Sequence, residues 1–436
     1  MSLNLLETPV RHLFGKYLVP TVCATLVTAI YLFADTVMIG HRLGASGVAA
    51  LNLIIPMEFF FFAVGSLFGN GGAILFTQYE SRGNHVEARK VFTTAATTVC
   101  VLSLAMMLTT VFGLRFVAST LLGAEASLLD DTLHYGQWIA WGCPAFVAVT
   151  FLQPFLRHDH APRLAMIGVL AGGGTNIVLD WIFIYPMDWG LSGAGLATLI
   201  GAFVAMAVML LHFYSPIHRL RLSRPLIRLL PTLIRFGGGS FLQELSGCVT
   251  VLLLNHIVLG ALGETGLVLY GVLTNYLLVL AALFNGIAHA AQPIIAANMA
   301  VGYARRVKQT LQLALGSAGG VGIGAMAVAL CFPLLLLNAF LPVEAIDTDR
   351  AITAIRIGAL AFPFVGIGQC VTLSLPALGR PNRGTILAFA RSGALLIPLA
   401  LLLPLWRAEA LWWAFVLAEV AIMPFVFWSL SARKQS

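Results

Sequence analysis

Long apolar stretches separated by short polar segments make up most of this 436-residue chain. A helix of about 20 residues crosses a hydrocarbon core of ~30 Å, and each stretch is long enough to do so. The pattern predicts twelve membrane-spanning helices. They lie at residues 16–40, 47–78, 89–114, 130–156, 162–186, 191–214, 232–258, 268–298, 309–338, 350–375, 382–405 and 409–431. Continuous apolar runs such as residues 395–403 exclude the alternating strands of a membrane β-barrel.

The second half of the chain repeats the first. Residues from 44 to about 180 align without a gap with residues 219 positions further on, so that Gly44 pairs with Gly263 and Pro144 with Pro363. Glycine and proline meet backbone needs that few other residues can meet, so their shared spacing indicates a duplicated unit. We predict an all-α polytopic membrane protein with two pseudo-symmetric six-helix lobes. The expected parts are an N-lobe at residues 1–214, a linker at 215–231 and a C-lobe at 232–436.

Composition agrees with a membrane protein and leaves no room for a soluble domain. Hydrophobic residues make up 59% of the chain and charged residues 10%, against roughly 25% charged residues in an ordinary soluble domain. The longest segment outside the predicted spans is the linker. The first apolar stretch has no small-residue cleavage site, so we expect it to be a retained span rather than a signal peptide.

The net charge of +7 could suggest a nucleic-acid partner, but the basic residues fall on alternate loops instead. We count Arg391, with Arg380 and Arg383, among the residues of the basic side. Only five of the 25 Lys and Arg residues lie on the other side, namely Arg42, Arg115, Arg350, Arg356 and Arg407. The positive-inside rule then places both termini and the linker in the cytoplasm. Six spans per lobe is an even number, so the two lobes form a parallel repeat.

Five acidic residues fall inside predicted spans: Asp35, Glu58, Asp180, Glu244 and Glu419. A charged side chain at membrane depth costs at least ~3 kcal/mol on insertion scales, so it usually faces a cavity and has a function. The repeat is asymmetric here, because the second half has Leu254 and Leu399 where the first has Asp35 and Asp180. Candidate chemistry therefore lies in the first half.

Asp35 and Asp180 both come late in helices that run outward, so we expect them at matching depth. Asn176 lies one turn before Asp180 and shares its helix face. Two neighbouring carboxylates in a poor dielectric can share a proton, which suggests a proton-coupling site. Alternatively, Asp180 lies at the outer interface, beside an aromatic belt of Trp181, Tyr185 and Trp189.

Pro20 falls inside the first span, where it removes one backbone hydrogen bond and permits a kink. A helix with a hinge near its inner part and an acid near its outer end can change shape when the acid changes charge. A static kink is the other interpretation.

Several enzyme and cofactor signals are absent from the sequence. The six cysteines stand singly, without a C-x-x-C pair, and no GxxxxGK[ST] nucleotide loop occurs. His158, Asp159 and His160 form a short polar run that we place in a cytoplasmic loop rather than at a metal. We therefore expect neither enzyme activity, nor a cofactor, nor a metal site built from cysteine and histidine.

Four segments carry a family resemblance. They are DTVMIGHRLG at residues 35–44, GNGGAILFTQYESRGNHVEAR at 69–89, its repeat at 292–308, and LDW at 179–181. Their order and spacing, with the doubled six-helix layout, resemble the multidrug and toxic compound extrusion (MATE) transporters over nearly the full chain. Within that family the chain is most similar to the DinF-like branch.

The resemblance implies an N-lobe coupling site and a hinge. The coupling residues that match are Asp35, Asn176, Asp180 and Thr198. Tyr31, Tyr135 and Gln153 match the further polar lining of the pocket, and Pro20 matches a proline around which the first helix is proposed to bend upon protonation. The four coupling residues could also ligate Na⁺ with hard oxygen atoms.

The NorM-like branch instead has a C-lobe cation site, made by a Glu on the seventh helix and an Asp on the tenth. Glu244 matches the first, but Gly368 or Gln369 stands at the second. Glu244 is therefore either a substrate contact in the pocket or a structurally paired acid. Glu58 and Glu419 match no motif, and we expect them to snorkel or to pack against a polar neighbour.

The implied activity is secondary active antiport by alternating access. Lipophilic organic cations would leave the cell in exchange for protons, or alternatively for Na⁺, across the plasma membrane of a bacterium or archaeon. The expected partners are these small cations and membrane lipid, with a monomeric state and no nucleic acid. The alternative is a lipid or oligosaccharide-lipid flippase of the same superfamily, whose cavity would carry several basic residues for a phosphate head group.

Overall fold

In this computed structural model, the described residues are 4–122, 126–216, 218–338 and 348–431. The first half forms α1 (Val10–Ser81), α2 (His85–Phe116), η1 (Val117–Leu121), α3 (Ala126–His158), α4 (Pro162–Ile184), α5 (Gly190–Leu210) and η2 (Leu211–Tyr214). The second half forms η3 (Ile227–Leu229), α6 (Leu230–Ala300), α7 (Ala304–Cys331), α8 (Pro333–Asn338), α9 (Thr348–Ala359), α10 (Phe362–Ser374), α11 (Pro381–Phe389), η5 (Ala390–Ala394), α12 (Leu396–Leu402), η6 (Leu403–Leu405), η7 (Ala408–Ala410) and α13 (Leu411–Leu430). The described chain is thus all-helical.

The predicted all-α membrane fold is confirmed. Ten helices of the described chain are long and apolar enough to cross a membrane. The span predicted at 232–258 is the first part of α6, and the one at 382–405 is broken into shorter pieces by the π-helical turn η5. Each of the twelve predicted spans therefore has a helical counterpart.

The repeat extends to the backbone conformation. α1 and α6 each join two spans, and each is interrupted by one glycine with a positive φ, 71° at Gly44 and 66° at Gly263. The tight turns after these helices use Gly83 and Gly302, with φ of 76° and 78°. These paired positions are 219 residues apart. Because glycine has no Cβ, it adopts this left-handed conformation at little cost.

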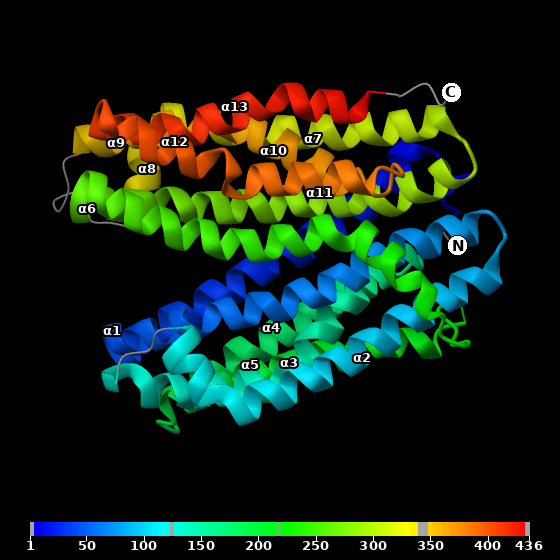
Figure 1. The fold of residues 1–436 in the computed structure, drawn as a ribbon, viewed down its shortest axis with the longest axis horizontal. Coiled ribbons are helices and arrows are strands. Elements are labelled where there is room, and N and C mark those ends of the chain that lie inside the picture. The colour runs from blue at the N-terminus through cyan, green and yellow to red at the C-terminus, as the bar shows by residue number, and fades with distance from the viewer. Residues whose placement is uncertain (1–3, 123–125, 217, 339–347, 432–436) are drawn as a thin grey trace.

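Figure 1 shows the two lobes side by side, the first coloured blue to green and the second green to red. α1 and α6 make the most extensive contact between them. The start of α1 belongs to the hydrophobic core of the second lobe, through Leu13, Phe14 and Tyr17. Ala24, two turns later, belongs to the core of the first lobe. α1 therefore crosses from one lobe to the other near Pro20.

Close backbone contacts join the lobes toward the end where the chain termini lie. The Thr21 hydroxyl donates to the Gly286 carbonyl across the interface, at 2.9 Å. A Cβ added at Gly71 would lie 2.5 Å from the Leu233 carbonyl oxygen, and one added at Gly237 would overlap the Leu67 carbonyl oxygen. We call the contact made by Thr21, Gly71, Gly237 and Gly286 the inner seam.

The linker is bound to the first lobe rather than free. The backbone N–H groups of Ser223 and Leu226 donate to the hydroxyls of Thr93 and Thr94, each at 2.8 Å. Asp159 is fully buried and accepts from the Arg219 N–H at 2.8 Å, and His212 lies 2.7 Å from the same carboxylate. The polar run at 158–160 lies at the end of α3 and in the turn before α4, as the sequence predicts, and Asp159 is in addition a buried anchor for the linker.

Candidate functional site

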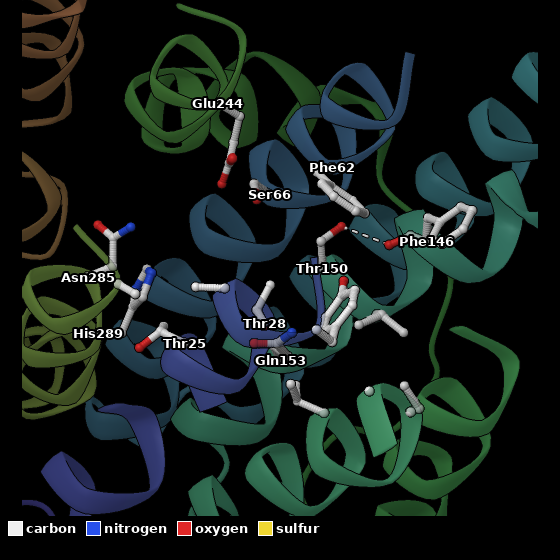
Figure 2. A pocket seen from close by; sticks show the side chains of 18 of the residues that line it. Thr25, Thr28, Phe62, Ser66, Phe146, Thr150, Gln153, Glu244, Asn285 and His289 are labelled. Carbon is white, nitrogen blue, oxygen red and sulfur yellow. Dashed lines mark hydrogen bonds between the residues drawn. The ribbon is translucent and has the colours of Figure 1, made fainter. Parts of the chain in front are cut away.

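A cavity of about 310 Å³ lies between the lobes, within the size range of small-molecule sites. Figure 2 shows Glu244, Asn285 and His289 of α6 on one side of it, and Thr150 and Gln153 of α3 with Phe62 and Ser66 of α1 on the other. Both lobes thus build its wall. A ligand held there would contact both of them.

Four aromatic rings line the cavity: Tyr31, Phe59, Phe62 and Phe146. Phe62 and Phe146 pack edge to face with ring centroids 6.0 Å apart. Glu244 is the one carboxylate among the described lining residues, while Arg157 is their one arginine. Aromatic faces and a carboxylate attract organic cations, so this wall suits a lipophilic cation.

Behind this wall, four side chains form what we call the N-lobe acid cluster: Asp35, Glu58, Asp180 and Tyr135. None of the four lines the cavity, and their exposed fractions are 5%, 5%, 0% and 2%. Tyr31, Asn176 and Thr198 stand in the wall in front of them. Asp35 and Asp180 thus belong to one buried cluster that does not line the cavity.

Tyr135 is the centre of the acid cluster. Its hydroxyl lies 3.4 Å from Asp35 Oδ2 and 3.3 Å from Glu58 Oε1, and it is within electrostatic reach of Asp180. Asp35 Oδ1 and both Asp180 carboxylate oxygens have no hydrogen-bond partner among the described residues. In the same described set, no Lys, Arg or His forms an ion pair with these acids. Buried carboxyls without a countercharge stay neutral only by binding protons or a cation.

Glycines bring the wall residues together. A Cβ at Gly172 would lie 2.6 Å from the Gly201 carbonyl oxygen, so these glycines let α4 and α5 approach closely. The approach puts Asn176 Nδ2 3.2 Å from Thr198 Oγ1. A Cβ at Gly173 would lie 3.1 Å from the Tyr31 ring, so this glycine leaves room for that ring to cover the cluster.

The remaining predicted lining residues divide between cavity and cluster. Gln153 and Glu244 line the cavity. Tyr135 does not line it, because its hydroxyl lies between the buried carboxyls of Asp35 and Glu58. Glu58 does not snorkel to the surface. It packs against a polar neighbour, Tyr135, which is the other outcome we considered.

The second lobe carries a charged network instead of a second acid pair. Arg391 donates to Glu419 at 3.1 Å and to Gln369 Oε1 at 2.8 Å. Gln369 Nε2 in turn donates to Asn285 Oδ1 at 2.6 Å, and Asn285 lines the cavity. A Cβ at Gly368 would lie 2.9 Å from Arg391 Nε. The Arg391 guanidinium therefore occupies the space where the expected tenth-helix acid would stand.

This network corrects the place of Arg391, which we counted with the cytoplasmic loops. Its side chain is 9% exposed, and it lies in η5, inside a predicted span. Counting charges loop by loop does not show whether an arginine near the end of a span lies in the loop or inside the protein. Arg391 lies inside and pairs with Glu419. Glu419, for its part, packs against a polar neighbour rather than snorkelling.

We expect Arg391→Met to destabilise the protein by roughly 1–3 kcal/mol, because it leaves the partly buried Glu419 without its partner. The matched control is the double variant Arg391→Met, Glu419→Met, which removes both charges and should recover most of that loss. Thermal unfolding in detergent measures both. Equal melting temperatures for the wild type and the single variant would contradict the pairing.

Metal ligands do not gather in the described parts of the chain. No group of three or more His, Cys, Asp or Glu side chains lies together in a way that could hold a metal ion. The acids of the cluster are connected through Tyr135 rather than around a common point. The five cysteines whose side chains are described are free thiols.

One family model, MatE, matches the chain twice, over residues 20–182 and 239–402. The chain belongs to the MatE family. The two matches begin 219 residues apart, the same spacing as the sequence repeat. Each match therefore covers most of one lobe.

Curated relatives and solved structures agree with the family. The chain is 26% identical over 411 residues to the multidrug export protein MepA of Staphylococcus saprophyticus, covering 92% of this chain and 89% of that protein. It is 24% identical over 418 residues to MepA of Staphylococcus aureus, covering 95% and 92%. The outward-facing structure of a multidrug resistance MATE transporter superposes with a TM-score of 0.90 at 19% identity, covering 98% of this chain and 97% of that one. A MATE structure in a bent conformation gives 0.88 at 20% identity, covering 98% and 96%. The two-lobe, twelve-helix MATE fold is therefore shown.

Three features of the site were not predicted from the sequence. Phe59 and Phe62 line the cavity, while Phe61 is in the core and Phe60 is half exposed. Tyr135 links Glu58 to Asp35, and Arg391 pairs with Glu419 across two helices. An unpaired acid and an unpaired arginine inside predicted spans were the available signals, because each needs a buried partner.

Proposed function

We propose that this protein is a secondary antiporter of the DinF-like branch that exports lipophilic organic cations in exchange for inward-moving protons. The observation that carries the proposal is the N-lobe acid cluster, buried without a countercharge behind the wall of the cavity between the lobes. Such a site must release positive charge when a cation binds nearby and take up positive charge when the cation leaves. Exchange of cargo for protons meets that need.

The cargo class rests on the cavity. Its aromatic rings and Glu244 favour a flat organic cation, and its volume fits a small drug-sized molecule. Relatives that share nearly the whole chain are named multidrug export proteins. The single arginine among the described lining residues argues against the phosphate head group that a lipid flippase would bind.

The mechanism is alternating access between the lobes. In the state described here the inner seam is closed, so the cavity would open away from the termini. Protons that arrive from outside neutralise Asp35 and its partners, which weakens the electrostatic hold on the cargo. The cargo then leaves, and the lobes reorient to load from the cytoplasm, where we place both termini and the linker.

Pro20 is well placed to connect the acid cluster to the lobes. The part of α1 before it packs in the core of the C-lobe, whereas the part after it packs in the N-lobe and carries Asp35. The next residue, Thr21, contributes to the inner seam. In the state described here α1 stays helical through Pro20. We propose that protonation of Asp35 bends α1 at this proline and loosens the seam.

The coupling ion we favour is the proton. Asn176 Nδ2 donates to Thr198 Oγ1, and among the described residues no three His, Cys, Asp or Glu side chains gather in a way that could hold a metal ion. In the C-lobe, the guanidinium of Arg391 fills the region of a second cation site. A Na⁺ ion at Asp35, Asn176, Asp180 and Thr198 is the competing assignment. We propose that the protein acts as a monomer in the plasma membrane, surrounded by lipid.

Ethidium transport in proteoliposomes tests this function. We expect an imposed proton gradient to drive ethidium against its concentration gradient, and an imposed Na⁺ gradient to have no effect. If only the Na⁺ gradient drives ethidium transport, the coupling ion is Na⁺ rather than the proton, while the proposed cargo class stands. If neither gradient drives transport, while a fluorescent phospholipid crosses the bilayer faster than in protein-free vesicles, the protein is a flippase instead.

A further inference from the structure

We propose that Glu58 is a second coupling acid, joined to Asp35 through the Tyr135 hydroxyl, which lets the site release two protons for a doubly charged cargo and one for a singly charged cargo. This inference rests on the proposed function and adds the number of protons. Nothing in the family resemblance assigns a role to Glu58.

The inference about Glu58 rests on the number of hydrogen bonds that the Tyr135 hydroxyl can donate and accept. A phenol has one proton to donate, yet its oxygen lies at nearly equal distances from two carboxyls, 3.4 Å from Asp35 and 3.3 Å from Glu58. Two ionised carboxylates would compete for that one proton. When both carboxyls are protonated, one donates to the phenol oxygen and the phenol donates to the carbonyl oxygen of the other, so all three groups are satisfied. After one proton has left, the phenol donates to one carboxylate while the remaining protonated carboxyl donates to the phenol. The proton can then move from one acid to the other through Tyr135.

The surroundings of Glu58 leave this acid no other partner for its charge. It is 5% exposed, and the described groups that face it are Asp35 and Tyr31 from α1 and Tyr135 from α3, with Asp180 from α4 beyond the phenol. All of these are neutral or acidic. The unpartnered oxygens of Asp180 add further negative potential to the same space.

Charge balance then fixes the stoichiometry. When a monovalent cation binds in the cavity, next to the wall residues, one carboxyl of the cluster behind them must lose its proton to keep the region neutral, and Asp35 or Glu58 can supply it. A divalent cation requires two. Both acids then ionise, Tyr135 donates to one of them, and the two protons leave to water. No bond other than O–H breaks in this exchange.

Ethidium and propidium make a matched pair of probes, because they share the phenanthridinium ring and propidium carries a second, quaternary ammonium charge. Purified protein in weakly buffered detergent solution, mixed with each dye, releases protons that a pH indicator counts. We expect the wild type to release one proton per bound ethidium and two per bound propidium. Glu58→Gln should release one for either dye, and Glu58→Asp should recover the second. The control Glu409→Gln changes an acid that is 65% exposed, and it should match the wild type.

The outcomes separate this inference from the proposed function. If the wild type releases no protons with either dye, proton coupling itself is wrong. If Glu58→Gln still releases two protons per propidium, the second proton comes from another acid and the role of Glu58 is overturned. If Glu58→Gln binds neither dye, infrared difference spectra of the wild type decide. Propidium should remove one more protonated-carboxyl C=O band than ethidium does, and equal losses would contradict the proposal.

Discussion

Asp35→Asn is expected to reduce proton-driven ethidium export to the level of protein-free vesicles. Asparagine has nearly the same shape as aspartate and can still accept the Tyr135 hydrogen bond, but it cannot bind or release a proton. The cluster then loses its acid on the first span of α1, Val10–Gly44, the span that crosses between the lobes, whereas Glu58 lies on the second span. Because that acid is unpaired and buried, its neutralisation should leave expression and thermal stability unchanged or slightly improved. Export rates in proteoliposomes, normalised to folded protein, measure the effect.

Asp188→Asn is the matched control for this change. Asp188 makes an exposed ion pair with Arg42, with 69% of its side chain exposed, and such pairs contribute little. Its variant should export at the wild-type rate. Export by Asp35→Asn at a rate comparable to the wild type would remove the central acid from the mechanism.

Gly237→Ala is expected to shift the protein away from the state with a closed inner seam. The new methyl group would overlap the Leu67 carbonyl oxygen of the opposite lobe, and backbone cannot move aside as a flexible side chain can. Overpacking of this kind costs roughly 1–3 kcal/mol, which corresponds to a population change of roughly 5–150-fold. Spin labels at Val86→Cys and Tyr303→Cys, in a background without exposed native cysteines, should report a longer distance between the lobes. Export should fall in parallel.

The neighbouring glycine provides the control. A Cβ at Gly238 would meet only Thr385 of its own lobe, at 3.4 Å, an ordinary contact. Gly238→Ala should therefore keep the wild-type label distance and export rate. Equal label distances for Gly237→Ala and the wild type would mean that the seam does not hold the lobes together in this state.

The fold followed from the sequence because its signals are local and redundant. The spans are set by hydrocarbon thickness, and the repeat is marked by residues such as Gly44 and Gly263, whose positive φ other residues rarely adopt. The sequence pattern gives no sign of the break in the eleventh predicted span. The helix η5 is a local π-helical turn around Arg391, and apolar periodicity carries no information about such a change in hydrogen bonding.

The site was predictable only in part, because partners depend on helix packing. Asp35 and Asp180 were expected at equal depth, and the structure does bring them to one cluster. That Tyr135 would lie between Asp35 and Glu58 depends on how three helices rotate about their axes, which no spacing within one helix reports. Likewise, the sequence indicates the depth of Glu419, but its pairing with Arg391 depends on the packing of η5 against α13, which the sequence does not report.

The central claim is that cargo and protons compete for the N-lobe acid cluster, and the affinity for tetraphenylphosphonium as a function of pH tests it most directly. We predict that the wild type binds this cation more weakly as pH falls, because protonated carboxyls no longer attract it. In Asp35→Asn the dependence on pH should be much shallower. A wild-type affinity that stays constant across the pH range in which the protein remains folded would contradict the account.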